Sequence, residues 1–264
     1  MPTITDKLIV SKQGGVGRIA FNNPDRRNAM TFEMWQGMPI VLDDFLGDSE
    51  VRVIEITGSG DKAFCAGADI SEFSKNRSGE DAVAEYNAAV AEASDALANA
   101  AKPTIARIKG FCVGGGVGIA LCCDLRFASD ASRFAVPAAK LGLGYGASGL
   151  KRLVDVVGPS MAKEIFFTAR QFDAHEAAAM GLVNRIQPVK ELDGYVDDIA
   201  ARIAGNAPMT IHAAKTVIDQ LVRSDGPPDE ALCDKVVDDC FASEDYAEGR
   251  KAFMEKRTPN FQGK

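Results

Sequence analysis

Histidine is almost absent from this chain of 264 residues, which contains only two, His175 and His212. The two lie far apart in the sequence, each in a helix-like segment, and neither resembles a metal ligand or a general base. Ser148 lies in a glycine-rich turn but lacks the Gly-x-Ser-x-Gly pattern of a nucleophile elbow. These absences argue against a serine hydrolase and against a histidine-based metal site.

The six cysteines include no Cys-x-x-Cys pair and have no histidine set at zinc-ligand spacing. We expect them to be reduced, mostly buried, small side chains. No apolar run reaches the roughly 18 residues that a membrane helix requires, and no secretory leader follows Met1. A soluble cytoplasmic protein without a metal or a membrane partner is therefore expected.

The formal net charge is −7, and no window interleaves basic with aromatic residues. Nucleic acid is therefore not an expected partner. With 46% hydrophobic residues, a chain of this length can bury a sizeable core in one main domain.

The glycine-rich segment from Gly110 to Gly118 follows a β-branched run and precedes a helix-like one. Its three adjacent glycines, 114–116, lose much chain entropy on folding, which indicates a need for close approach or positive φ. Amides at a helix N-terminus suit an anion or a developing oxyanion. The spacing does not match Gly-x-Gly-x-x-Gly, and no ribose-binding acid follows, so a nicotinamide-dependent dehydrogenase is disfavoured.

A second glycine-bearing loop, residues 59–70, follows the strand-like run 51–57 and contains Ala66-Gly67-Ala68-Asp69. Two loops of this kind can direct two backbone amides at one point. Elsewhere, the runs 8–11 and 16–21 predict a hairpin.

A helix is predicted to open with Thr31 as its N-cap, and Pro39 is expected to bend it or delay its start. Its apolar face repeats at spacings of three and four residues. From Ser148 onward the sequence is almost wholly helical in character.

Three motifs together resemble the crotonase (enoyl-CoA hydratase/isomerase) superfamily. They are Asn-x-Pro-x-x-x-Asn-Ala at 22–29, Ala-Gly-x-Asp at 66–69 and Gly-x-x-x-Gly-Gly-Gly at 110–116. The resemblance extends along nearly the whole chain. It implies an α/β fold, a spiral of ββα units over residues 1–200 with a C-terminal helical region over 201–264. It also implies assembly into a homotrimer or homohexamer through the last helices.

The resemblance also implies a binding site. In that family the amides of the residues matching Ala68 and Gly115 form the oxyanion hole that holds the thioester carbonyl of an acyl-CoA. Ala66 matches the position whose backbone contacts the adenine end of CoA, and Asp69 and Ile70 are included among the expected CoA contacts. No cofactor beyond the CoA moiety of the substrate is expected.

The phosphates of CoA require only a local cluster of positive charge. Arg26, Arg27 and Lys62 are the candidates in this sequence.

The two glutamates by which hydratases of the family transfer protons are missing. Their positions are taken by Gly118 and by Ala138, which follows Phe134-Ala135-Val136-Pro137. Glycine and alanine cannot transfer protons, so hydration by the two-glutamate route is expected to be lost or severely weakened. The oxyanion hole would remain, and each of its donors contributes roughly 3–4 kcal/mol in well-studied enzymes.

Tyr145 is the main candidate for a catalytic side chain. Its location is similar to that of a tyrosine in the methylmalonyl-CoA decarboxylase subgroup, which orients the substrate carboxylate. Decarboxylation produces its own carbanion and needs no general base. The subgroup has a histidine where this chain has Ala68, so the resemblance is partial, and a tyrosine that only packs its ring is the alternative.

We therefore predict an acyl-CoA enzyme that stabilises an enolate, in the first place a lyase such as a decarboxylase. One alternative is an enoyl-CoA hydratase or isomerase with a relocated acid or base, for which Glu72, Glu85 and Tyr86 are candidates. The other is a non-catalytic acyl-CoA-binding protein.

Overall fold

The computed structural model describes residues 5–72, 80–222 and 226–264, and within these ranges the strands form two sheets. The larger has the order β1-β2-β3-β5-β7-β10 and the smaller the order β4-β6-β8-β9. The larger sheet consists of β1 (Leu8–Gln13), β2 (Val16–Phe21), β3 (Val53–Gly58), β5 (Thr104–Ile108), β7 (Leu125–Ser129) and β10 (Arg185–Gln187). The smaller consists of β4 (Ala63–Cys65), β6 (Phe111–Val113), β8 (Arg133–Ala135) and β9 (Phe172–Asp173).

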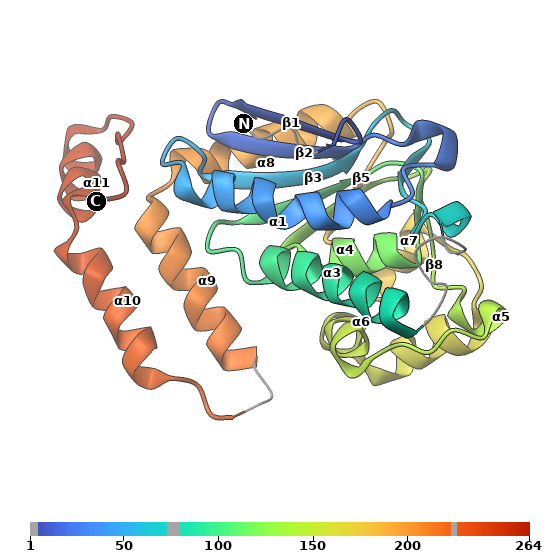
Figure 1. Ribbon diagram of the computed structural model, residues 1–264. Coiled ribbons are helices and arrows are strands. Elements are labelled where there is room, and N and C mark those ends of the chain that lie inside the picture. Colours follow the sequence, from blue (N-terminus) through green and yellow to red (C-terminus); the bar gives the residue numbers. More distant parts are fainter. Residues whose placement is uncertain (1–4, 73–79, 223–225) are drawn as a thin grey trace.

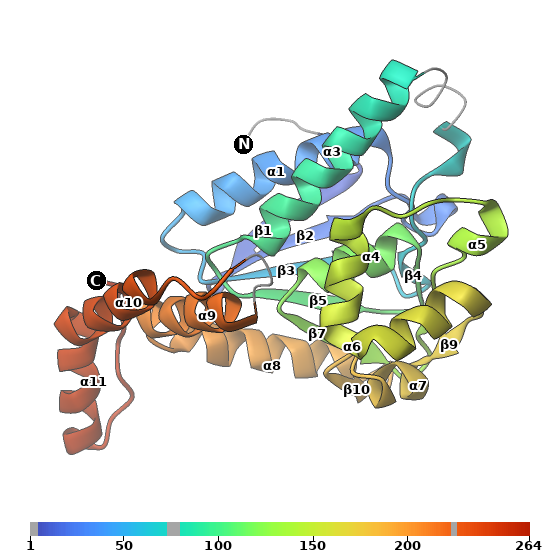
Figure 2. The same ribbon diagram turned by 90° about the horizontal axis from the view of Figure 1, so that it is seen from below.

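The two sheets are built by a repeating unit. Each unit adds a strand to the larger sheet, then a strand to the smaller sheet, and then a helix. The units are β3, β4 and α3 (Glu80–Ala98); β5, β6 and α4 (Gly115–Cys122); and β7, β8 and the helices α5 (Ala138–Leu141) and α6 (Ala147–Thr168). Equivalent strands pair in parallel, β3 with β5 and β5 with β7. This arrangement, seen from below in Figure 2, confirms the predicted ββα spiral.

The N-terminal hairpin and the first helix form largely as predicted. Gly14 and Gly15 have φ of +59° and +80°, which a two-residue hairpin loop between β1 and β2 favours. Helix α1 (Phe32–Gly47) has Thr31 as its N-cap and contains Pro39. The predicted delay of its start is therefore wrong, because burial of the apolar face offsets the hydrogen bond that proline removes. That buried face includes Trp35, Met38, Leu42 and Phe45.

Two apolar layers cover the two faces of the larger sheet. Along β3, Ile54 and Ile56 join the main core with α1 and α3, whereas Val53 joins a second core with α8 (Leu192–Gly205). Figure 1 shows α1 and α3 on one face of the sheet and α8 behind the other. Burial of each large aliphatic side chain contributes about 1.5–3 kcal/mol, so the alternation along the strands holds both helix layers.

A buried ion network connects α8 to the sheet. Glu55 on β3 is fully buried and accepts hydrogen bonds from Arg18 Nε at 3.0 Å and from Arg107 Nη2 at 2.8 Å. Arg107 also bonds to Asp193 and Asp197 on α8. Burial alone would lower the pKa of Arg107, but these carboxylates outweigh it and raise the pKa. The network fixes the position of α8 through charge as well as packing.

The chain after Ser148 is less uniformly helical than predicted. It contains α7 (Ala174–Ala179), α9 (Pro208–Val222), α10 (Glu230–Ala242) and α11 (Glu244–Glu255), but also strands β9 and β10. Sequence reasoning missed these strands because two or three residues are too few to show an alternation. The backbone of α6 also leaves helical geometry at Gly158, where φ is 74°.

The last three helices stand to one side of the spiral (Figure 1). The boundary that we predicted at residue 200 falls within α8, and Ala204 still packs in the core beneath the sheet. A division into two domains stays a prediction.

Among the described residues, no helix has the length and apolar character required to cross a bilayer. The cysteines are unpaired, and Cys65, Cys112, Cys122 and Cys123 are buried. In the same part of the chain no group of His, Cys, Asp or Glu could hold a metal ion.

Candidate active site

The two glycine-bearing loops meet backbone to backbone. A Cβ at Gly67 would lie 3.3 Å from the amide nitrogen of Gly115, and a Cβ at Gly115 would lie 3.7 Å from the amide nitrogen of Ala68. Gly67 has φ of +97°, a conformation that glycine adopts without strain. Folding therefore brings Ala68 and Gly115, which are 47 positions apart in the sequence, side by side.

Hydrogen bonds fix the direction of the Ala68 amide. Met30 and Ala68 form a parallel bridge, in which the Met30 N–H donates to Gly67 O at 2.7 Å and the Asp69 N–H donates to Met30 O at 2.9 Å. The groups that flank Ala68 thus face Met30, and its own N–H points to the opposite side. Among the described residues, the Ala68 and Gly115 amides donate to no other group. Two neighbouring open donors can hold one anionic oxygen.

The three consecutive glycines at the start of α4 have different roles. Gly114 is the N-cap, with φ of 55°, and its N–H donates to Ala135 O at 2.8 Å. Gly116 packs so closely that a Cβ there would lie 2.2 Å from Cys65 O. Gly115 opens the helix between them and turns its amide toward the Ala68 loop. The structure confirms the predicted need for close approach and positive φ.

Asn28 connects the motif at 22–29 to the Ala68 loop. It has φ of +56°, and its side-chain amide donates to Ser59 O at 3.0 Å and to Ala63 O at 2.7 Å. Its side-chain oxygen accepts from the Asn23 N–H at 3.1 Å. Sequence reasoning gave Asn28 no role beyond the motif, although an asparagine in a loop is a known signal for a left-handed conformation.

Cys65 also supports the loop that carries Ala68. The Gly67 N–H donates to Cys65 Sγ at 3.3 Å, and burial raises the pKa of this thiol to about 12. A protonated thiol can accept this amide without placing a negative charge beside the candidate oxyanion site. Cys65 is therefore a structural support of the loop.

The predicted CoA contacts 66, 69 and 70 follow one another along this loop. The Ala66 N–H donates to Arg27 O at 3.0 Å, which leaves its carbonyl for an adenine amino group. The Asp69 carboxylate accepts from the Ser71 N–H at 3.0 Å and from its hydroxyl at 2.6 Å, so this side chain holds the loop. Ile70 begins the short helix η2 (Ile70–Glu72). Contact of these residues with CoA stays a prediction.

The predicted phosphate-binding residues are exposed, and two of them contact the same residue, Phe111. The Arg27 guanidinium lies 4.6 Å from the centroid of the Phe111 ring, and Lys62 O accepts the Phe111 N–H at 3.1 Å. Arg26 ends the short helix η1 (Pro24–Arg26), one residue before Arg27. Arg27 and Lys62, far apart in the sequence, are thus both next to Phe111.

The two positions of the missing glutamates differ in their surroundings. Gly118 is exposed on α4, and a Cβ built there meets no atom within 4 Å. Ala138 begins α5 and is 3% exposed, within the main core. Neither position carries an acid, so the expectation that the two-glutamate route is unavailable still applies.

Tyr145 lies in the loop between α5 and α6. Its ring is 38% exposed and packs edge to face against Phe166, with centroids 5.0 Å apart. Burial of part of the ring raises the pKa of its hydroxyl. Such packing is expected of a tyrosine with a purely structural role, and a catalytic role for Tyr145 stays a prediction.

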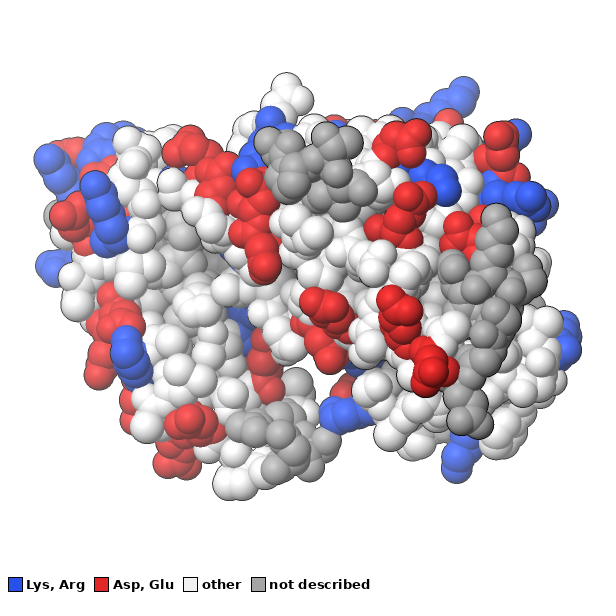
Figure 3. Space-filling view, viewed as in Figure 1, with Lys and Arg blue, Asp and Glu red and all other residues white. Residues whose placement is uncertain are grey.

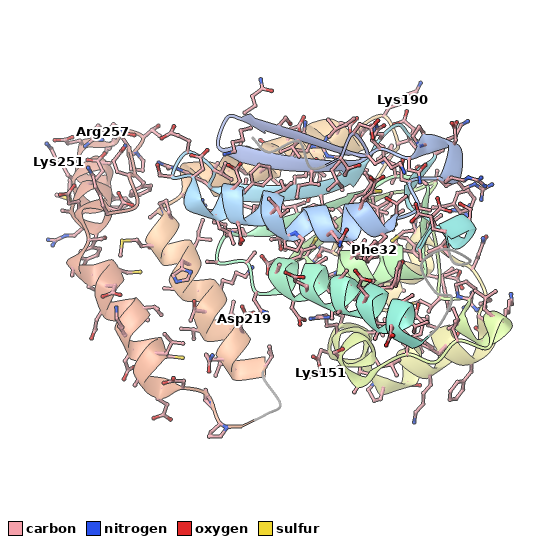
Figure 4. All side chains as sticks on the ribbon, in the orientation of Figure 1. Phe32, Lys151, Lys190, Asp219, Lys251 and Arg257 are labelled. Carbon is pink, nitrogen blue, oxygen red and sulfur yellow. The ribbon has the colours of Figure 1, made fainter. Side chains whose placement is uncertain are left out.

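The three relocated acid or base candidates fall in different environments. Tyr86 is 3% exposed, its hydroxyl accepts from Trp35 Nε1 at 3.1 Å, and its ring stacks on Phe32, which lies between α1 and α3 in Figure 4. It therefore belongs to the core. Glu85 is exposed on α3. Glu72 is half-buried, four residues after Ala68, and its carboxylate accepts from the Phe32 N–H at 3.0 Å.

In the family that the sequence resembles, the loop after Asp69 borders the acyl pocket, and residues 73–77 of this loop lie outside the described residues. The described part of the site therefore consists of the two loops, the first turns of α4 and the η2 helix.

Fold and site together define a class of α/β proteins, in which a ββα spiral places two open backbone amides at the start of a central helix. The chain belongs to the enoyl-CoA hydratase/isomerase family, whose model matches residues 11–264. It is 35% identical to the short-chain-enoyl-CoA hydratase of Clostridium acetobutylicum, over 96% of each chain. It is 34% identical to the crotonyl-CoA hydratase of Syntrophomonas wolfei, over 97% of this chain and 98% of that protein.

The fold is also closely similar to that of a solved structure. An enoyl-CoA hydratase/carnithine racemase from Magnetospirillum magneticum superposes with a TM-score of 0.92 at 35% identity, over 98% of this chain and 97% of that one. The assignment to the crotonase superfamily, predicted from three motifs, is therefore confirmed, and with it the general character of an acyl-CoA enzyme.

Proposed function

We propose that the protein acts on a 2-enoyl-CoA or a related thioester and catalyses hydration or isomerisation. The observation that supports this most directly is the pair of open amides at Ala68 and Gly115. In the reaction, negative charge develops on the thioester oxygen as the α-carbon becomes an enolate. Two preorganised donors stabilise that charge more than they stabilise the neutral carbonyl, which is the condition for catalysis.

The similarity to proteins named as enoyl-CoA hydratases favours hydratase chemistry over a lyase. Hydration adds hydroxide from water to the β-carbon and a proton to the α-carbon, whereas isomerisation moves a proton from the γ-carbon to the α-carbon. Both reactions need a proton-transfer group, and neither Gly118 nor Ala138 can be one. The group must therefore come from another position.

Glu72 is the best candidate for that group. It directly follows the loop that carries Ala68, and half of its side chain is shielded from water. The hydrogen bond from the Phe32 N–H holds one carboxylate oxygen at the start of α1. Glu85 points into solvent and Tyr86 is held in the core, so both are weaker candidates.

Hydration of crotonyl-CoA by the purified protein tests this proposal. We expect measurable turnover that falls by about 10²-fold or more in Glu72→Gln, the range typical of a lost general acid or base. Glu85→Gln is the matched control and should leave turnover unchanged. If Glu72→Gln is as active as the unaltered protein, Glu72 is not the proton-transfer group.

Decarboxylation is the second candidate, and one observation favours it. Both glutamate positions lack an acid, and loss of CO₂ creates the enolate without a base. Methylmalonyl-CoA should then release CO₂, and Tyr145→Phe should slow this reaction. Binding of both thioesters without turnover of either would instead support a non-catalytic acyl-CoA-binding protein.

The C-terminal helices support a proposal of self-association as a homotrimer or homohexamer. Phe253 and Met254 on α11 are 84% and 81% exposed. A groove of about 740 Å³ lies between α9 and the last two helices, with a mainly apolar lining that includes Val217, Val237, Phe241 and Phe261. In Figure 3 the surface between α9 and α10 is largely uncharged. Light scattering of the purified protein will give its mass in solution.

A cytoplasmic location of the protein also stays a prediction.

A further inference from the structure

Four glycines lie in or beside the first turn of α4, and the protein itself explains three of them. Gly114 has φ of +55°, a Cβ at Gly116 would overlap Cys65 O, and Gly115 approaches the backbone of Gly67. Gly118 has none of these reasons. Its φ is not positive, and a Cβ built on it meets no atom within 4 Å.

The backbone polar groups of Gly118 are also satisfied within the helix. Its N–H donates to Gly114 O at 3.2 Å, and its carbonyl accepts from the Cys122 thiol at 3.2 Å. An exposed glycine inside a helix costs about 0.5–1 kcal/mol relative to alanine. Nothing in the described residues offsets that cost or fills the space beside the Gly118 Cα.

The position of this space follows from helix geometry. Gly118 is three residues after Gly115, so both lie on the same helix face, about 5–6 Å apart. A thioester oxygen at the Gly115 amide puts the α- and β-carbons of the acyl group within a few bonds of that oxygen. An acyl group that extends along this helix face would bring these carbons, and any branch that they carry, next to Gly118.

We propose that Gly118 makes room for acyl groups that carry a branch at the α- or β-carbon, so that the protein prefers branched over straight short-chain acyl-CoA thioesters. This inference rests on the proposed acyl-CoA function and specifies its substrate class. Gly118 acts as a specificity determinant through the absence of a side chain. A larger residue at this position would occupy the volume that the branch needs.

Calorimetric binding of three unreactive saturated thioesters tests this proposal. Butyryl-CoA is the straight probe, and 2-methylbutyryl-CoA and isovaleryl-CoA each add one methyl group to it, at the α-carbon and at the β-carbon respectively. For the unaltered protein we expect at least one branched probe to bind about fourfold more tightly than butyryl-CoA, the factor that burial of one further methyl or methylene group supplies. In Gly118→Val this preference should reverse, with a loss of tenfold or more for the branched probe and little change for butyryl-CoA.

Gly194 provides a matched control. It is an exposed helical glycine whose Cβ would also meet no atom within 4 Å, but it lies on α8, on the other face of the larger sheet. Gly194→Val should leave the affinities for all three probes unchanged. Gly118→Ala and Gly194→Ala should both raise stability, which verifies that the Gly118 variants fold.

Each outcome has a definite meaning. If butyryl-CoA binds but neither branched probe binds more tightly, the inference about Gly118 is overturned and the acyl-CoA function stands. Equal losses for all three probes in Gly118→Val would also overturn it, because the side chain would then block the site as a whole. If none of the thioesters binds, both the proposed function and the inference are wrong.

Discussion

The two sides of the candidate site are built in different ways. On the amide side, Ala68 and Gly115 are positioned by backbone contacts and by the side chain of Asn28, all within or beside the main core. On the other side, where relatives of the hydratase type carry two glutamates, the chain has an exposed glycine and a buried alanine. Two open amides that can hold an oxyanion are thus present, without an acid at either of these two positions.

From this difference we expect acyl-CoA binding and proton transfer to be physically separable in this fold. The amide side depends on atoms that every residue has, and on small residues that let two loops touch. The proton-transfer side depends on particular side chains, which can be exchanged without disturbing the backbone. Acyl-CoA binding is therefore a firmer expectation than any particular reaction.

The largest effect is expected from a substitution at Gly116 that displaces the backbone on the amide side of the site. In Gly116→Ala the new Cβ would lie 2.2 Å from Cys65 O, so α4 or the Cys65 strand must move. We expect the free energy of unfolding to fall by about 3 kcal/mol. Any turnover should fall by about 10²-fold as the Gly115 amide is displaced. Urea denaturation and initial rates measure the two effects, and a fully stable variant would show that the packing is looser than described.

Asn28→Ala should have a smaller effect, through the connection between the two loops. It leaves the carbonyls of Ser59 and Ala63 without their donor and puts alanine at φ of +56°. We expect the free energy of unfolding, measured by urea denaturation, to fall by about 2 kcal/mol. Asn22→Ala is the matched control, because that side chain makes one exposed hydrogen bond, to Asp6 O, and should cost less than about 1 kcal/mol. Equal losses would contradict a special role for Asn28.

The smallest effect is expected at Asp69 and depends on pH. Burial would raise the pKa of this carboxyl, but hydrogen bonds from Ser71 and Asn23 and the charge of Arg26 outweigh burial and lower the pKa. A folded-state pKa below the unfolded value stabilises the fold above that unfolded value, about 3.9, and the benefit is lost as the pH falls through the folded pKa.

Asp69→Asn should therefore destabilise the protein by about 1 kcal/mol at pH 7 and by less at pH 3. Thermal unfolding at the two values of pH measures this difference. A loss that is equal at both would show that the ionised carboxylate is not what holds the loop.

Much of the fold could be predicted because its signals are local. The hairpin of the runs 8–11 and 16–21 and the start of α1 after Thr31 each depend on a few neighbouring residues, and the structure has them where they were predicted. The short strands β9 and β10 were missed because their pairing with distant strands, and not their own sequence, defines them. Pro39 does not delay the start of α1, because burial of the rest of the helix decides where it begins, and the alternative effect, a bend, stays a prediction.

For the site, the sequence by itself determined which residues carry the amides, that α4 begins at three glycines and that both glutamate positions lack an acid. These are properties of residue identity and of local backbone preference. Only the tertiary structure decided that Asn28 connects the loops, that Tyr86 is a core residue and that Gly118 faces open space while Ala138 is buried. The reason is that burial and the partners of a polar group depend on segments far apart in the chain, which meet only when the spiral closes.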